Sequence, residues 1–198
     1  MRRLAALLGE PPVPEGTWAE EAVYLSAAAL RRRVDPRELA GRIPGASVLP
    51  NGMLRIVVER PGELVEEVEP VRPPDEWPDL PRTWDNPGFV VRYGHVRACW
   101  TERWARDLGV PEGPFLPELL DHPLDRKVLR VLAELPARRL SRDPAWESYL
   151  VRLALAYHDA FECAPALPKG DEAIKPLHTA RVRLAGAVSK VLPGPGWL

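Results

Sequence analysis

Residues 146–163, WESYLVRLALAYHDAFEC, carry the clearest helical pattern in this chain of 198 residues. Their apolar positions follow one another at intervals of four, three, one, three and four residues: Trp146, Leu150, Leu153, Ala154, Tyr157 and Phe161. This spacing keeps one face of an α-helix apolar over about four turns. Asp143, Pro144 and Glu147 form a helix start signal just before it. The stretch therefore predicts a helix that packs against other helices.

Further helical patterns surround this one. We expect helices over about 86–107, 124–135 and 173–192, each bounded by Pro, Gly or an N-cap residue. Short connections between helices are typical of antiparallel bundles. No strand period is found after residue 60. The fold class is therefore predicted to be mainly α, an antiparallel helical bundle over residues 86–198.

The first sixty residues show a mixed pattern. Thr17 and Glu20 have the spacing of a capping box and predict a helix from Thr17 to the arginines at 31–33. A second, shorter helix is expected over 35–42. Asn51-Gly52 joins two apolar runs and favours a tight hairpin turn. Residues 1–60 are therefore predicted to form a small α+β domain with a β-hairpin.

Residues 61–85 differ in composition from both flanking parts. They contain eight acidic residues, two arginines and six prolines. So many prolines rule out a continuous helix and favour a semi-extended, solvated segment. We interpret 61–85 as a Pro-rich acidic connector between the two folded parts.

Composition limits the function classes. Hydrophobic residues make up 45% and charged residues 28% of the chain, and the net charge is −1, values typical of a folded soluble protein. Such a charge argues against bulk binding of nucleic acid, so we expect no DNA partner. No segment reaches the ~20 apolar residues of a membrane span. The opening apolar stretch ends at Leu8 and is short for a signal peptide. We expect a cytoplasmic protein with no membrane association.

Catalytic and metal-binding patterns are missing from the sequence. The four histidines and two cysteines lack the spacing of metal ligands, and no Gly-rich phosphate loop is present. His95 and Cys99 are four residues apart and could pair a base with a nucleophile, yet no third group or oxyanion element accompanies them. We therefore expect no catalytic residues, no metal, no cofactor and no enzymatic activity.

Three stretches of the predicted bundle, in order, resemble the anticodon-binding (DALR-type) domain of arginyl-tRNA synthetases. The first is NPGFVVRYGHVRACW at 86–100, with matches at Asn86, Pro87, Phe89, Tyr93, His95 and Arg97. The second is SYLVRLALAYHDAF, with matches at Tyr149, Leu150, Leu153, Ala154, Tyr157, His158 and Phe161. The third resembles the closing helix at Arg181, Leu184, Ala187 and Val191.

The first sixty residues are similar to the end of the N-terminal additional domain of the same synthetases. The matches are Tyr24, Leu25, Ala28, Pro36, Glu38, Leu39, Ala40, Gly52 and Leu54. The synthetase signatures of the ATP-binding catalytic core have no counterpart between the two parts, where the acidic connector stands. The resemblance therefore implies a paralogue of arginyl-tRNA synthetase that lacks catalysis.

The resemblance implies tRNA as a partner, bound by its anticodon arm. Phe89, Arg92 and Tyr93 share one helical turn, which places an aromatic platform beside a cation. We expect RNA to be bound by seven residues: Phe89, Arg92, Tyr93, Arg97, Arg138, Arg139 and Arg142. Val90 replaces the family's tyrosine and Arg92 its glutamine, and the family's apolar tail is not matched before Trp197 and Leu198. Specificity for the arginine anticodon is therefore not expected.

A second hypothesis needs no nucleic acid. Trp77 and Trp84 lie in the connector among prolines and acids, and tryptophans are frequent in interface hot spots. The chain could then be a regulatory scaffold that binds a protein partner through this segment. A mobility titration with unfractionated tRNA at several salt concentrations distinguishes the two hypotheses, because tRNA binding has a steep salt dependence.

Overall fold

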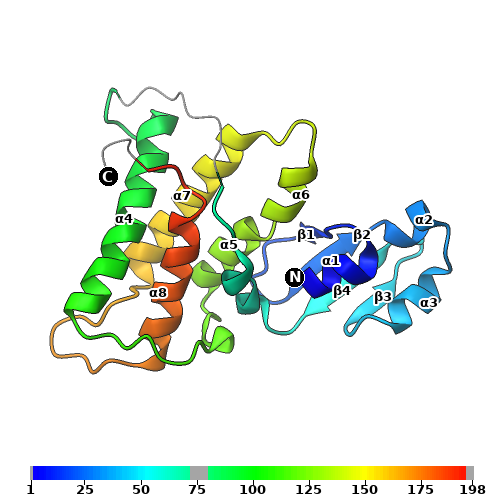
Figure 1. Cartoon of the computed structure of the whole chain (residues 1–198), viewed down its shortest axis with the longest axis horizontal. Helices are drawn as coiled ribbons and strands as arrows, with labels where there is room; N and C mark the ends of the chain where they lie inside the picture. Colours follow the sequence, from blue (N-terminus) through cyan, green and yellow to red (C-terminus); the bar gives the residue numbers. More distant parts are fainter. Residues whose placement is uncertain (1, 72–79, 195–198) are drawn as a thin grey trace.

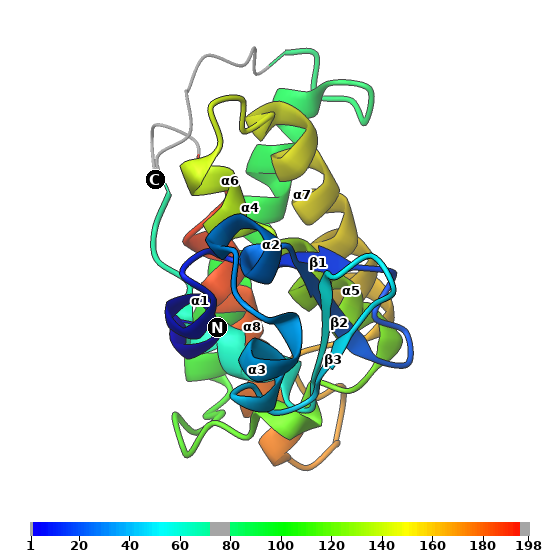
Figure 2. The same ribbon diagram turned by 90° about the vertical axis from the view of Figure 1, so that its right-hand side faces the viewer.

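Short helices and strands make up the N-terminal lobe of the computed structural model, which describes residues 2–71 and 80–194. The elements of this lobe are α1 (Arg2–Leu8), β1 (Val13–Glu15), β2 (Ala22–Ser26), α2 (Ala28–Arg32), α3 (Pro36–Gly41), β3 (Ala46–Val48) and β4 (Leu54–Val58). The strands form an antiparallel sheet in the order β1-β2-β4-β3. Helices α1, α2 and α3 lie on one face of this sheet (Figure 2).

The predicted hairpin is confirmed as β3 and β4. Val48 pairs with Leu54, and the turn between them contains Asn51 and Gly52. The Asn51 side-chain oxygen accepts a hydrogen bond of 3.0 Å from the Met53 amide. Gly52 has φ +79°, a conformation that glycine adopts at little cost.

The helix predicted from Thr17 to Arg33 is wrong. Residues 22–26 form the strand β2, which pairs with both β1 and β4, and only residues 28–32 are helical. Trp18, in the loop before β2, is buried with φ +63°, and its indole nitrogen donates to the Val23 carbonyl at 3.0 Å. The Thr17 hydroxyl accepts only a weak contact of 3.4 Å from the Ala19 amide. The apparent capping box therefore begins no helix.

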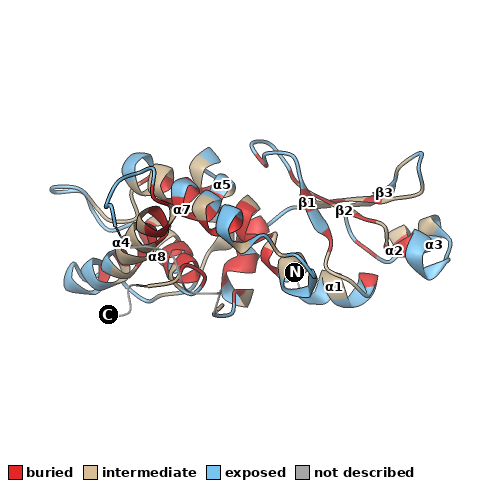
Figure 3. Cartoon of the chain, turned by 90° about the horizontal axis from the view of Figure 1, so that it is seen from above, coloured by how far each residue is buried: buried red, intermediate tan, exposed pale blue. Residues whose placement is uncertain are grey.

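The C-terminal lobe is helical in its described residues, which confirms the mainly α fold. Its elements are α4 (Pro87–Asp107), η2 (Pro117–Leu119), α5 (Pro123–Leu132), α6 (Leu135–Leu140), α7 (Trp146–Cys163) and α8 (Pro176–Ser189). Figure 1 shows α4, α7 and α8 packed together, with α5 between them and the N-terminal lobe. The buried residues lie where these helices face one another (Figure 3).

The boundaries of these helices differ from the expected ones in three places. The helix that contains the apolar stripe begins at Trp146, after Ala145 in a left-handed conformation, rather than at the Asp143 start signal. The last helix spans 176–189 rather than 173–192. The expected helix over 124–135 ends at Leu132, and α6 follows as a separate element.

The first part of the expected connector is packed rather than solvated. Residues Pro61–Glu67 form the 3-10 helix η1, in which Pro61, Leu64 and Val65 are buried. This segment contacts α5, α8 and η2. Prolines and acids dominated the composition here, but the apolar residues between them cover the bundle. Residues 72–79, including Trp77, lie outside the described residues.

Arginines of α5 join the two lobes. Arg126 donates from Nη1 to the Glu20 carbonyl at 2.8 Å, and Arg130 donates from Nε to the Gly16 carbonyl at 2.9 Å. Both acceptors lie in the loop between β1 and β2. This loop is therefore held against the bundle by hydrogen bonds from charged donors, which are stronger than neutral ones.

Asn86 determines where α4 begins. Its side-chain oxygen accepts from the Gly88 amide at 3.0 Å, and its side-chain nitrogen donates to the Pro81 carbonyl at 2.9 Å. We expect Asn86→Ala to lower the free energy of unfolding by about 1–2 kcal/mol, because both interactions are lost from a buried N-cap. Urea denaturation measures this change. Asn86→Asp, which keeps the acceptor, should cost less; equal stability of all three proteins would contradict this role.

Candidate nucleic-acid interface

Helix α4 turns one face to the core and the opposite face outward. The inward side is formed by Val90, Val91, Gly94, Ala98, Thr101 and Ala105, all of which are buried. Arg97 lies at the edge of α4 that contacts α7. The outward side carries Phe89, with Arg92 and Tyr93 three and four residues after it, together with Trp100 and Trp104. Because residues at this spacing share a helix face, the predicted aromatic and basic side chains are brought together.

Four rings form what we call the α4 aromatic cluster: Trp84, Phe89, Tyr93 and His158. Phe89 and Tyr93 are stacked, with centroids 5.5 Å apart and planes at 22°. Trp84 meets both rings edge-on, at 6.0 and 5.5 Å, and lies 4.8 Å from the His158 ring of α7. About half of the Trp84 surface, 51%, is exposed. The cluster therefore presents an aromatic surface that is ordered by packing and open to solvent.

Arg97 supports this cluster from inside the protein. Its Nη1 lies 2.7 Å from Glu162 Oε1 and 2.7 Å from His158 Nδ1. Its guanidinium lies over the Tyr93 and Phe161 rings, at 4.5 and 4.4 Å. Since arginine only donates, Nδ1 of His158 is the acceptor in this contact. The Arg97 side chain is 17% exposed, so its contact with RNA stays a prediction, whereas its contacts with protein groups are extensive.

The remaining predicted arginines are distributed differently. Arg92 is half-buried on the outward side of α4, close to Phe89 in sequence. Arg138, Arg139 and Arg142 belong to α6 or the loop after it, and α7 separates α6 from α4 in the view of Figure 1. Arg139 binds Glu69 Oε2 at 3.1 Å and the Pro70 carbonyl at 3.0 Å. Arg142 is exposed and forms no ion pair with the described part of the chain.

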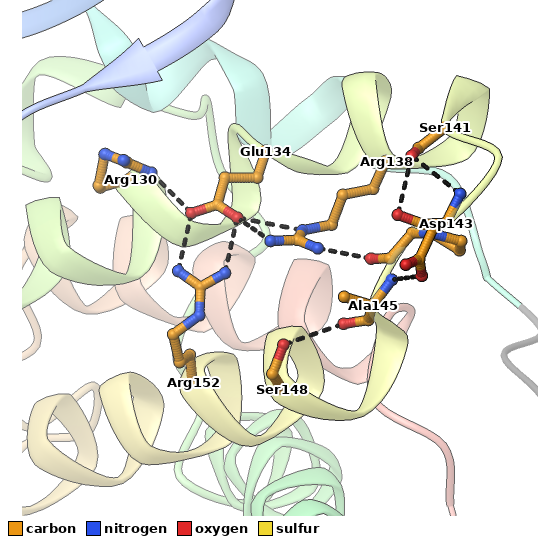
Figure 4. A network of polar contacts seen from close by, with 9 residues as sticks. Arg130, Glu134, Arg138, Ser141, Asp143, Ala145, Ser148 and Arg152 are labelled. Carbon is orange, nitrogen blue, oxygen red and sulfur yellow. Dashed lines mark hydrogen bonds and ion pairs between the residues drawn. The ribbon is translucent and has the colours of Figure 1, made fainter.

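Arg138 belongs to a network centred on Glu134 (Figure 4). Glu134 accepts hydrogen bonds from Arg130, Arg138 and Arg152, and Arg138 also lies 4.8 Å from the Tyr149 ring centroid. Burial acts to raise the pKa of Glu134, but the hydrogen bonds from Arg152, Arg138 and Arg130 outweigh it and lower the pKa to about 2. Arg130, Arg138 and Arg152 therefore form a structural network with Glu134 between α5, α6 and α7.

His95 and Cys99 are hydrogen-bonded to each other. Cys99 Sγ lies 3.3 Å from His95 Nε2, and His95 Nδ1 lies 2.8 Å from the Leu192 carbonyl. The carbonyl requires a proton on Nδ1, which leaves Nε2 to accept from the thiol. Burial raises the pKa of Cys99, and Glu102 raises it further. Both effects favour the protonated thiol, which is a poor nucleophile.

The described residues contain neither a metal-binding cluster nor a membrane-spanning helix. Among residues 2–71 and 80–194, no group of three or more His, Cys, Asp or Glu side chains is placed to hold a metal ion. Within those ranges, no helix combines the length and the apolar character that crossing a bilayer requires.

Sequence patterns indicated no RNA contact for two residues of the α4 aromatic cluster, Trp84 and His158. The sequence pattern places Trp84 in a protein-docking connector, whereas its ring packs on α4 and α7 in the structure. His158 matched the family motif without a role in the expected site. His158 joins the cluster through contacts with Trp84 and Arg97, which lie more than sixty residues before it in the sequence, and helix periodicity does not reveal such contacts.

Comparison with known proteins gives arginine–tRNA ligases among the relatives. The chain is 38% identical over 116 residues to an arginine–tRNA ligase of Clavibacter sepedonicus, and 37% identical over 118 residues to one of Frankia alni. Each match covers 56% of this chain and 21% of the relative. The chain therefore spans about a fifth of the length of these relatives. No family model and no solved structure matches it. The matched part is related in sequence to arginine–tRNA ligases.

Proposed function

We propose that this chain is a non-catalytic, tRNA-binding paralogue of arginyl-tRNA synthetase that holds an anticodon arm against the α4 aromatic cluster. The observation that carries the proposal is the stacked pair Phe89 and Tyr93, which the half-exposed Trp84 meets edge-on. An unpaired base stacked on such a ring contributes about 1–3 kcal/mol. The relationship to arginine–tRNA ligases supports tRNA as the source of those bases.

Several charged groups support the phosphate contacts of this proposal. Arg82 is exposed, close in sequence to Trp84, and forms no ion pair within the described ranges. Arg92 lies on the outward side of α4. Arg97 acts as a positioning residue, because it fixes Tyr93, Phe161 and His158 relative to one another. The RNA would therefore meet a rigid aromatic surface with cations at its edge.

The affinity for tRNA should depend on stacking by the Phe89 and Tyr93 rings rather than on the apolar bulk of these side chains. We expect Phe89→Leu combined with Tyr93→Leu to weaken tRNA binding about 10- to 100-fold, as one stacked base is lost. A mobility titration with unfractionated tRNA at low and high salt measures the change. Leu140→Ala, an exposed apolar residue on α6, serves as the control and should bind as the wild type does.

Two results would overturn the proposal. One is the absence of any mobility shift at micromolar protein and low salt, where phosphate contacts are strongest. The other is equal affinity of the double leucine variant and the wild type. Binding of a protein partner through Trp84 is the alternative function. The contacts of the Trp84 ring with α4 and α7 support this alternative less, because they engage part of the ring within the chain itself.

A further inference from the structure

A second pair of aromatic rings lies farther along α4. Trp100 and Trp104 have centroids 5.4 Å apart and planes tilted by 40°. Their exposed fractions are 39% and 41%, so about two fifths of each side chain faces solvent. The Arg103 guanidinium lies 4.9 Å from the Trp100 ring centroid. The outer side of α4 thus carries two indoles and a stacked cation that the core does not use.

These rings continue the α4 aromatic cluster in the same direction. Phe89 and Trp100 are eleven residues apart, which is close to three turns and places both on the outward side. The rise of the helix separates them by about 16 Å. Tyr93 lies between them on this side. A ligand that follows the helix axis from the first cluster would therefore meet the second pair of rings.

The charges beside the second pair favour a polyanion. Arg103 and Arg106 are exposed and form no ion pair with residues in the described ranges. Glu102 is turned toward α8, where its Oε2 accepts from Ser189 at 3.3 Å. Asp107, which is exposed, is the carboxylate nearest in sequence that remains on the outer side. Arg103, which lies over the Trp100 ring and has no ion pair among the described residues, sets a cation beside the exposed indoles and matches the combination of phosphate and base that a nucleotide presents.

We propose that Trp100, Arg103 and Trp104 form a second stacking site, which binds unpaired bases of the same RNA strand that the α4 aromatic cluster takes up. The inference rests on the proposed function and adds a second contact to it. The indoles stack on bases, while Arg103 contacts the phosphate between them. The occupant is single-stranded RNA, so a base-paired duplex, whose bases are not accessible, is not bound here.

The test uses the full chain and three fluorescently labelled probes: an oligouridine, an RNA duplex of the same length, and unfractionated tRNA. Fluorescence anisotropy gives the affinity for each. We expect Trp100→Leu combined with Trp104→Leu to weaken oligouridine binding about 10-fold or more, because leucine keeps the apolar bulk but not the stacking. Duplex binding should not change. Leu155→Ala on α7, an exposed apolar residue with a similar exposed fraction of 41%, is the control.

A charge variant provides an independent measurement. Asp107→Asn should strengthen oligouridine binding a few-fold at low salt and leave it unchanged at high salt, where the repulsion of phosphates is screened. Circular dichroism of each variant confirms that α4 remains folded, as expected for changes at exposed positions.

The outcomes separate the two proposals. If the Phe89 and Tyr93 variant loses tRNA binding but the Trp100 and Trp104 variant binds oligouridine and tRNA as the wild type does, the second site is refuted and the proposed function stands. If tRNA does not bind at all while oligouridine binding depends on the two tryptophans, the proposed function fails and the stacking site stands. Equal loss of duplex and oligouridine binding would also refute the stacking site.

Discussion

Asp125→Ala should lower the free energy of unfolding by about 3–5 kcal/mol, the cost of leaving one member of a buried ion pair without its partner. Asp125 lies in α5 and is 1% exposed, and its Oδ2 accepts from Arg181 Nε at 2.9 Å. Arg181 lies in α8 and also donates to the Pro165 carbonyl at 3.1 Å. Its side chain is 10% exposed. Without Asp125, a guanidinium stays inside the protein with no opposing charge.

A second variant shows whether the pair itself stabilises the bundle. Burial raises the pKa of Asp125, and Arg181 opposes this rise without cancelling it. Removing the Asp125 carboxylate from water therefore costs more free energy than its attraction to Arg181 returns. Asp125→Leu combined with Arg181→Met should therefore recover most of the stability that Asp125→Ala loses. Urea denaturation measures both variants. Arg183→Ala, an exposed arginine of α8, is the control. A loss below about 1 kcal/mol for Asp125→Ala would contradict the role of the pair.

Local signals explain which helices the sequence predicted well. Asn86 caps α4 and Pro87 occupies its first turn, so the predicted range 86–107 agrees with Pro87–Asp107 to within one residue. The residues of β2 predicted a helix because their apolar positions fit the helical period as well as the strand period. Its partners β1 and β4 complete the sheet from positions up to 36 residues away, as in the pairing of Ala22 with Val58. Such pairings override local propensity and leave no local signal.

In the candidate site, too, local spacing predicted some contacts and contacts between distant segments were missed. Phe89 and Tyr93 are four residues apart, so their contact followed from helix geometry alone. The position of Trp84 depends on how the chain returns to α7, and no spacing predicts it. Arg138 is one of the predicted RNA contacts, and Glu134 stands four residues before it at ion-pair spacing. That spacing could have indicated the structural role of Arg138.

Glu134→Gln should lower the free energy of unfolding by about 3 kcal/mol at neutral pH, and the loss should disappear in acid. Glu134 is 13% exposed and lies between α5 and α6. Arg152 binds both of its oxygens, at 2.9 and 2.7 Å, while Arg130 and Arg138 bind one each, at 2.8 and 2.7 Å. Glutamine keeps the shape of the side chain but leaves three guanidiniums facing one another without a carboxylate.

The pH dependence follows from the direction of the pKa change. Arginine hydrogen bonds lower the pKa of Glu134 from 4.5 to about 2 in the folded protein. A carboxyl whose pKa is lowered by folding stabilises the protein above its unfolded value, and this stability is lost as the pH falls through the folded value. The wild type should therefore exceed Glu134→Gln by about 3 kcal/mol above pH 4.5 and approach it near pH 2.

Denaturation curves recorded at a series of pH values test this expectation. Glu118→Gln, an exposed glutamate of η2, is the matched control and should follow the wild type within about 0.5 kcal/mol at every pH. A difference between Glu134→Gln and the wild type that persists unchanged to about pH 2 would show that the lost interaction is not the charge of Glu134. The negative charge of Glu134 would then not be what holds α5, α6 and α7 together at this junction.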